Sequence, residues 1–147
     1  MAITVNWFGL GLQKIMEQDH DLETATVKLA LVTSTEVPNR DTDDFWDDAS
    51  ANEVANGNGY TTGGVTLTSV AITYDSASDQ VRVDADDASW TFTGSKTWRY
   101  GYIYVDTAGA SSTDPVIGLL TWDSDQSVST AYTLQWDAAG ILYLDTT

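Results

Sequence analysis

The chain has 147 residues, 22 acidic against 6 basic side chains, a formal net charge of −16, no cysteine and a single histidine. This length suits one domain that buries a sizeable core without help from disulfides or structural zinc. The absence of cysteine excludes disulfide frameworks, cysteine-based zinc sites, iron–sulfur clusters and cysteine nucleophiles. A single histidine excludes multi-histidine metal sites, and we predict no cofactor.

The negative charge is spread along the chain from Glu17 to Asp145. Phosphate groups repel such a surface, because affinity for nucleic acids comes largely from lysine and arginine. Anionic lipids are disfavoured for the same reason. No segment reaches the ~20 apolar residues that span a bilayer, and residues 1–12 lack the basic start of a signal peptide. We expect no nucleic-acid or membrane partner, and synthesis and folding in a cytoplasm.

One stretch has helical spacing, at residues 7–17. Phe8, Leu12, Ile15 and Met16 follow an i, i+4, i+7, i+8 pattern that gives one apolar stripe. Gly9 and Gly11 lower its helix propensity. The sequence predicts a helical arm within residues 1–20, ended by the acidic turn around His20.

Strand patterns follow, at intervals of roughly ten residues. Apolar residues alternate with polar ones at 26–33, and residues 65–74 predict a strand with a bulge between Leu67 and Val70. Gly94 and Ser95 predict a two-residue hairpin turn, and 137–140 a hairpin loop. The other expected strands lie around Val81–Val83 and Trp90–Phe92 and at 98–106, 116–122, 131–136 and 141–145. We predict a mostly β fold, a single antiparallel β-sandwich or barrel-like domain over residues 1–147 with a short N-terminal helix.

Residues 36–64 form the least regular region, an acidic and glycine-rich loop. Long loops in compact domains are frequently functional or interfacial. Phe45 and Trp46 lie inside its acidic run, so they must either fold back onto the sandwich or meet a partner. Both alternatives stay open on the sequence.

Clustered carboxylates raise the question of calcium, which prefers oxygen ligands. Asp84, Asp86 and Asp87, and the run at 41–48, supply such oxygens, but neither has the spacing of an EF-hand loop. The favoured interpretation is that Asp86 and Asp87 cap nearby backbone amides in turns. His20 is flanked by Asp19 and Asp21, which could support it as a general base. The chain has no Gly-x-Ser-x-Gly motif that would supply a nucleophile. The simpler role of His20 is a cation at a helix C-terminus.

Aromatic residues recur at period two in one expected strand, at Trp98, Tyr100, Tyr102 and Tyr104. Such a face can form a stacking platform for sugars, or a core face whose hydroxyls reach partners at the rim. Because Ile103 and Val105 lie on the opposite face, the pattern favours a central strand covered on both sides. More widely, a domain rich in tryptophan and tyrosine is typical of proteins that form interfaces.

Several motifs resemble, in order, a family of small virion structural proteins of tailed bacteriophages and prophages. Each motif is short, but together they follow an N-terminal aromatic helix and cover nearly the whole chain. They are 21–34 (DLETATVKLALVTS), 45–48 (FWDD), 51–54 (ANEV), 59–67 (GYTTGGVTL), 84–90 (DADDASW), 98–106 (WRYGYIYVD), 115–118 (PVIG) and 134–142 (LQWDAAGIL). The resemblance implies a noncatalytic particle component assembled in the host cytoplasm, with Asp84, Asp86, Asp87 and Trp90 as parts of a structural corner.

The sequence and this resemblance together predict a capsid decoration (cement) protein on the outer head surface of a virion, and not an enzyme. The expected partners are the major capsid protein or other virion proteins, together with further copies of the chain in a homo-oligomer. The expected apolar anchors are Trp7 and Phe8, or Phe45 and Trp46. The alternatives are a tail, neck or fibre-associated structural protein, and a host-glycan-binding module that uses the tyrosine face.

Overall fold

Antiparallel strands make up most of the fold in the computed structural model, which describes residues 2–146; residues 1 and 147 of the predicted domain lie outside the described residues. Strands account for 46% and helices for 10%, which confirms a mostly β, sandwich-like domain with one short N-terminal helix. The elements are β1 (Ile3–Trp7), α1 (Gly9–Met16), β2 (Thr26–Val32), α2 (Asp47–Ser50), β3 (Val65–Thr66), β4 (Ala71–Asp75), β5 (Gln80–Asp84), β6 (Ala88–Thr91), β7 (Lys96–Asp106), the 3-10 turn η1 (Ser111–Thr113), β8 (Val116–Val128), β9 (Ala131–Leu134) and β10 (Leu142–Asp145).

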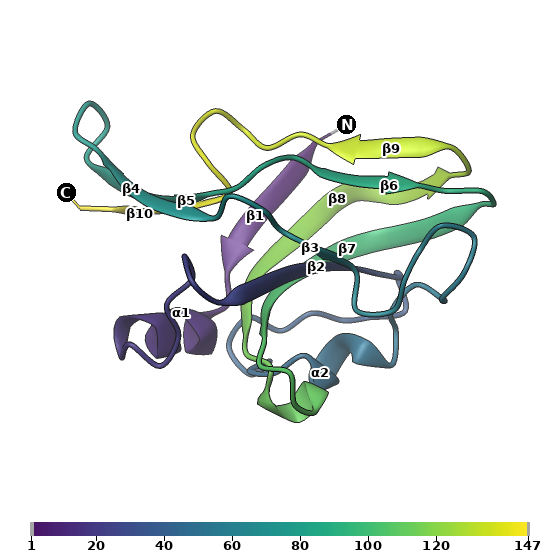
Figure 1. The fold of residues 1–147 in the computed structure, drawn as a ribbon, viewed down its shortest axis with the longest axis horizontal. Helices are drawn as coiled ribbons and strands as arrows, with labels where there is room; N and C mark the ends of the chain where they lie inside the picture. The colour runs from purple at the N-terminus through teal and green to yellow at the C-terminus, as the bar shows by residue number, and fades with distance from the viewer. Residues whose placement is uncertain (1, 147) are drawn as a thin grey trace.

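The described elements form three layers (Figure 1). The middle layer is a five-stranded sheet in the order β1-β8-β7-β2-β3, and two smaller sheets, β10-β5-β4 and β6-β9, cover one of its faces. The larger hydrophobic core lies between these sheets and includes Leu29, Ile103, Leu120 and Trp122. On the other face α1 and the loop that carries α2 enclose a second core. The middle sheet is therefore buried on both sides.

The N-terminal arm differs from the prediction of a helix within residues 1–20. Its helix spans only Gly9–Met16, and the preceding residues form β1, an edge strand paired with β8. Ile3, Val5 and Trp7 alternate along β1 and pack against the larger core. The alternation was present in the sequence, but it covers only five residues. Because the helical spacing begins directly after it, the whole segment was interpreted as one helical arm.

Three predicted local connections are wrong. The strand expected at 65–74 is divided, since β3 pairs with β2 in the middle sheet whereas β4 pairs with β5 in an outer one. The chain crosses between layers at residues 67–70, where a bulge was predicted. Gly94 and Ser95 do not close a hairpin, because β6 pairs with β9 and not with β7. The turn at 137–140 likewise joins strands of different sheets, because β10 pairs with β5.

The long strand β7 changes the face on which its aromatic residues lie. Its register with β8 shifts between Trp98 and Tyr100. As a result Trp98 packs into the larger core, against Trp122 and Tyr132, whereas Tyr102 and Tyr104 pack into the second core. The four aromatic residues therefore do not share one face, as their spacing had predicted.

Candidate interaction surface

Two of the four expected anchor residues lie inside the molecule. Phe8 is 0% exposed and Trp46 is 5% exposed. The Trp46 indole stacks on the Tyr104 ring, with 5.0 Å between centroids and 4° between planes, and the Phe8 ring lies 5.2 Å from that of Tyr102. The 36–64 loop thus folds back onto the sheet, and neither Phe8 nor Trp46 offers the exposed anchor expected of it.

The other two anchor residues are half-buried. The Trp7 indole N–H donates a hydrogen bond to the backbone oxygen of Tyr143, at 3.0 Å. The ammonium of Lys14 lies 4.9 Å from the centre of the Phe45 ring, a cation–π contact. Both side chains are engaged within the chain, and their role in an interface stays a prediction.

The tyrosines of β7 form a core face. Tyr102 and Tyr104 are buried, and their hydroxyls donate to Asp43 Oδ2 at 3.3 Å and to the Gly63 carbonyl at 2.7 Å. Burial, followed by the nearby negative charge of Asp43, raises the pKa of Tyr102, so its hydroxyl stays protonated. The interpretation as a covered central strand is confirmed, and the tyrosine face offers no open platform for a sugar.

The three aspartates considered for calcium form hydrogen bonds that hold their corner together, but Asp86 and Asp87 do not cap nearby backbone amides as predicted. Asp86 Oδ2 accepts hydrogen bonds from the hydroxyls of Ser69, at 2.6 Å, and Thr68, at 2.9 Å, which lower the pKa of Asp86. Asp87 accepts the N–H of Trp136, and Asp84 that of Ala85. Among residues 2–146 no group of three or more acidic or histidine side chains is arranged to hold a metal ion.

A partly buried carboxylate that the sequence analysis did not single out, that of Glu53, lies within the 36–64 loop. Glu53 Oε1 accepts the Tyr60 hydroxyl at 2.7 Å and the Gly63 N–H at 2.6 Å, and the Tyr60 oxygen accepts the N–H of Leu31 at 2.9 Å. Burial raises the pKa of Glu53 against the opposing hydrogen bonds from Tyr60 and Gly63 and the charge of Lys28. The group ties the loop to β2, and it lines none of the three cavities described below.

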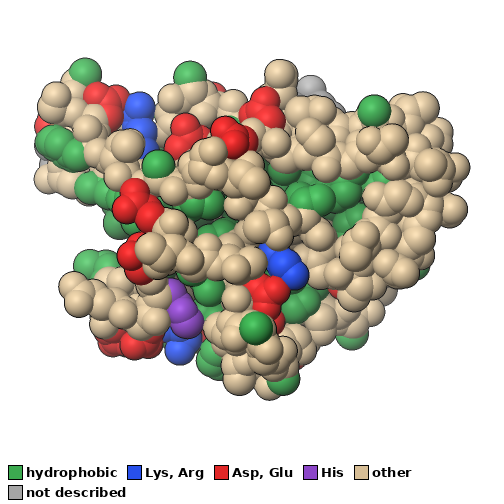
Figure 2. Space-filling view, in the orientation of Figure 1, with side chains coloured by type: hydrophobic (Ala, Val, Ile, Leu, Met, Phe, Trp, Pro, Cys, Tyr) green, Lys and Arg blue, Asp and Glu red, His purple; other side chains and the backbone are tan. Residues whose placement is uncertain are grey.

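The largest of the three cavities, about 470 Å³, lies between the end of α1 and strand β4. Its lining comes from Ile15 of α1, the turn residues Gln18, His20, Asp21 and Leu22, and Ile72 of β4. At the left of Figure 2 the surface is indented here, between the projecting β10-β5-β4 sheet and α1, with hydrophobic side chains on the upper wall. We call this hollow the α1–β4 groove. His20 is thus placed in a cavity wall, where Asp21 Oδ1 accepts the N–H of Glu23.

Exposed apolar side chains continue from the groove along β4. Ile72 is 39% exposed and Tyr74 58%, high values for residues on a strand. The Tyr74 hydroxyl donates to Asp79 Oδ1 at 2.9 Å, and Glu23 Oε1 accepts the backbone N–H of Ile72 at 3.0 Å. Contiguous exposed apolar surface with a polar border is typical of interaction sites. The sequence showed the alternation of β4 but not that its apolar face lies outside the core.

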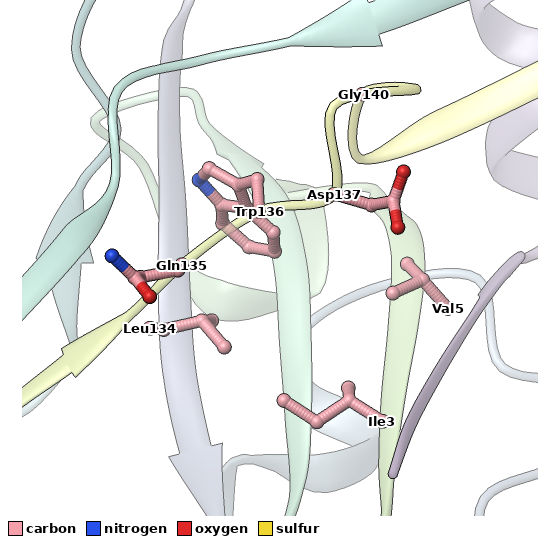
Figure 3. A pocket seen from close by; sticks show the side chains of 7 residues that line it. All are labelled: Ile3, Val5, Leu134, Gln135, Trp136, Asp137 and Gly140. Carbon is pink, nitrogen blue, oxygen red and sulfur yellow. The ribbon is translucent and has the colours of Figure 1, made fainter.

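A second cavity, about 320 Å³, lies between β1 and the segment after β9. Figure 3 shows the Trp136 indole above Ile3 and Leu134 in this view, with the Asp137 carboxylate near Val5. The indole N–H of Trp136 donates to the Asp86 carbonyl at 3.0 Å, and Asp137 Oδ1 accepts the N–H of Ala139 at 2.8 Å. These polar groups hold the corner together, which leaves Gln135 as the free polar side chain of the wall.

A third cavity, about 250 Å³, lies where β1 meets β10 and is lined by residues that include Trp7, Arg40 and Tyr143. It has no paired carboxylates and no nucleophile beside a base. Of the three cavities, the α1–β4 groove is the largest, and it borders a strand with two exposed apolar side chains, Ile72 and Tyr74. We therefore take it as the candidate interaction surface.

No helix within residues 2–146 is both long and apolar enough to cross a membrane. A scan against family models, a search of curated proteins and a search of solved structures each found no match to this chain.

Proposed function

We propose that this protein is a structural component of a tailed-bacteriophage virion, and specifically a capsid decoration protein on the outer surface of the head. It acts by binding and has no catalytic activity. Its partners are the major capsid protein or other virion proteins, and copies of the chain associate with one another. Assembly takes place in the host cytoplasm.

The observation that carries this proposal is an apolar, partly exposed groove set in a strongly acidic protein. The net charge of −16 suits the outer face of a capsid better than the DNA-facing interior, where phosphate would repel it. The α1–β4 groove supplies the apolar contact area that the buried Phe8 and Trp46 do not. The ordered virion-protein motifs support the same function. Many copies on one shell would add weak contacts by avidity.

Of the alternatives, a tail, neck or fibre-associated role is supported by the same motifs and the same groove. A host-glycan-binding module loses its specific support, because Tyr102 and Tyr104 are covered by Trp46 and Phe8. We therefore retain the tail or neck component as the second candidate.

The test is the number of copies per particle. Quantitative mass spectrometry of purified virions, normalised to the major capsid protein, is expected to give a ratio near one or another simple fraction of the lattice. A ratio of a few hundredths would replace the decoration role by the tail or neck role. Absence of the protein from purified virions would overturn both.

A further inference from the structure

The β10-β5-β4 sheet has one apolar face that runs across all three strands. Register pairs Ile72 with Val83 and Val83 with Leu142, so these three side chains lie in one row on the same face. Val83 and Leu142 are buried in the larger core, but Ile72 at the edge is exposed. The core therefore covers this face at Val83 and Leu142. The part of the face at Ile72 is left uncovered and borders the α1–β4 groove.

Strand β4 also leaves backbone groups without a strand partner. It is the edge of its sheet, with β5 as its one neighbour. The Ile72 N–H bonds to the Glu23 side chain at 3.0 Å, which shows that it points away from β5. In an antiparallel ladder the backbone groups of alternate residues point the same way, so those of Tyr74 also face the open edge. An extended segment can hydrogen-bond to such an edge while alternate side chains continue its apolar face.

The border of the groove is acidic. Glu17, Asp19, Asp21, Glu23 and Asp79 lie in or beside the segments that form it. The nearest arginine of the sheet, Arg82, is paired with Asp75, at 2.8 Å. Charge complementarity thus favours a cationic partner and disfavours a second copy of a chain with a net charge of −16.

We propose that the α1–β4 groove binds an extended segment of another protein, one that carries lysine or arginine beside apolar residues. The segment adds to the edge of β4, places an apolar side chain in the cavity between Ile15, Leu22 and Ile72, and sets its cationic side chains against the acidic border. That this other protein is a virion component rests on the proposed function; the chemistry of the segment rests on the groove.

The direct test uses a short synthetic peptide in which lysine alternates with valine, and its glutamate–valine counterpart. We expect the lysine peptide to shift the NMR signals of Ile15, Leu22 and Ile72 and to slow hydrogen exchange at the Tyr74 amide. We expect its affinity to fall by about tenfold or more between low and high salt, since the cationic contacts are screened. Signal shifts confined to another surface, no binding of the lysine peptide, or equal binding of both peptides would overturn the proposal.

Paired variants separate the groove from general surface effects. Ile72→Ser removes the apolar contact, and Tyr143→Ser is its control, because Tyr143 is 49% exposed and lies on the opposite face of the same sheet. Asp19→Lys reverses a charge beside the groove, and Asp47→Lys reverses one in α2, an exposed site elsewhere. We expect peptide binding to weaken about tenfold in the first member of each pair, a loss of about 1.4 kcal/mol, and to change less than about twofold in its control. Equal effects of the two variants in each pair would contradict the proposal that the peptide binds in the α1–β4 groove.

The same variants separate this inference from the proposed function. If the wild-type protein binds purified virions and Ile72→Ser and Asp19→Lys bind them equally well, the groove is not the docking site although the virion role stands. If the lysine peptide occupies the groove but the protein is absent from virions, the groove is supported and the virion role is overturned. Unchanged thermal unfolding of each variant is the check that it has folded.

Discussion

At the scale of single residues, Glu53 shows how one partly buried carboxylate holds a long loop in place. Its Oε1 accepts hydrogen bonds from both the Tyr60 hydroxyl and the Gly63 N–H. The Tyr60 oxygen in turn accepts the backbone N–H of Leu31 in β2. A buried donor that loses its acceptor is destabilising by about 1–3 kcal/mol. We expect Glu53→Ala to lower the free energy of unfolding by about that amount, measured by urea denaturation. Glu53→Gln, which keeps an oxygen acceptor, is the matched control and should lose less.

The difference in stability between the wild type and Glu53→Gln depends on pH, because the pKa of Glu53 is raised. Its ordinary value is 4.5, and burial raises it in the folded protein. As pH rises from 4.5 through the raised pKa, the unfolded chain releases the proton before the folded protein does, so the wild type loses stability relative to Glu53→Gln. Unfolding free energies at several pH values between 4 and 7 should show this difference. Parallel curves for the two proteins would contradict a raised pKa.

At the scale of elements, helix α1 depends on a glycine for its position. A Cβ at Gly11 would lie 1.9 Å from the Val116 carbonyl oxygen of β8, too close for any side chain. In the sequence Gly11 weakened the helix prediction, whereas in the fold it lets α1 pack directly against the sheet. Ile15, four residues further along the same side of α1, borders the α1–β4 groove.

We therefore expect Gly11→Ala to destabilise the protein by about 1–3 kcal/mol, although alanine favours helix by up to ~1 kcal/mol. Gly9→Ala is the control, since its Cβ would meet the Arg40 carbonyl oxygen at an ordinary 3.6 Å. Thermal unfolding should show a lower Tm for Gly11→Ala and no loss for Gly9→Ala. A Tm for Gly11→Ala equal to or above that of the wild type would show that α1 does not approach β8 this closely.

At the scale of the whole molecule, charge repulsion opposes folding. The net charge is −16, and the described ion pairs are few: Lys28–Asp106, Arg82–Asp75 and Arg99–Asp125. Compacting such a chain brings like charges together, and salt screens them. We expect Tm to rise between low and moderate sodium chloride at pH 7. A fall in Tm over this range would mean that the attractive pairs outweigh the repulsion.

The sequence by itself determined the elements that depend on local pattern. The β-rich class, most strand positions and the short helix followed from period-two and helical spacing, because each pattern reports which side chains of one segment face a core. Tyr102 and Tyr104 were assigned to a core face for the same reason, since Ile103 alternates with them, and they are buried. The local turn roles predicted for Asp86 and Asp87 did not follow, because Asp86 accepts the hydroxyls of Thr68 and Ser69 and Asp87 accepts the distant N–H of Trp136.

Only the tertiary structure decided which strands pair and which apolar residues remain outside. β6 pairs with β9 and β10 with β5, partners distant in sequence, because each pairing depends on burying a face against another layer and not on the turn that follows the strand. The same packing buries Phe8 and Trp46, which were expected as interface anchors, and leaves Ile72 at an open edge. The α1–β4 groove arises from this arrangement, since its two walls meet only when the sheets and helix have assembled.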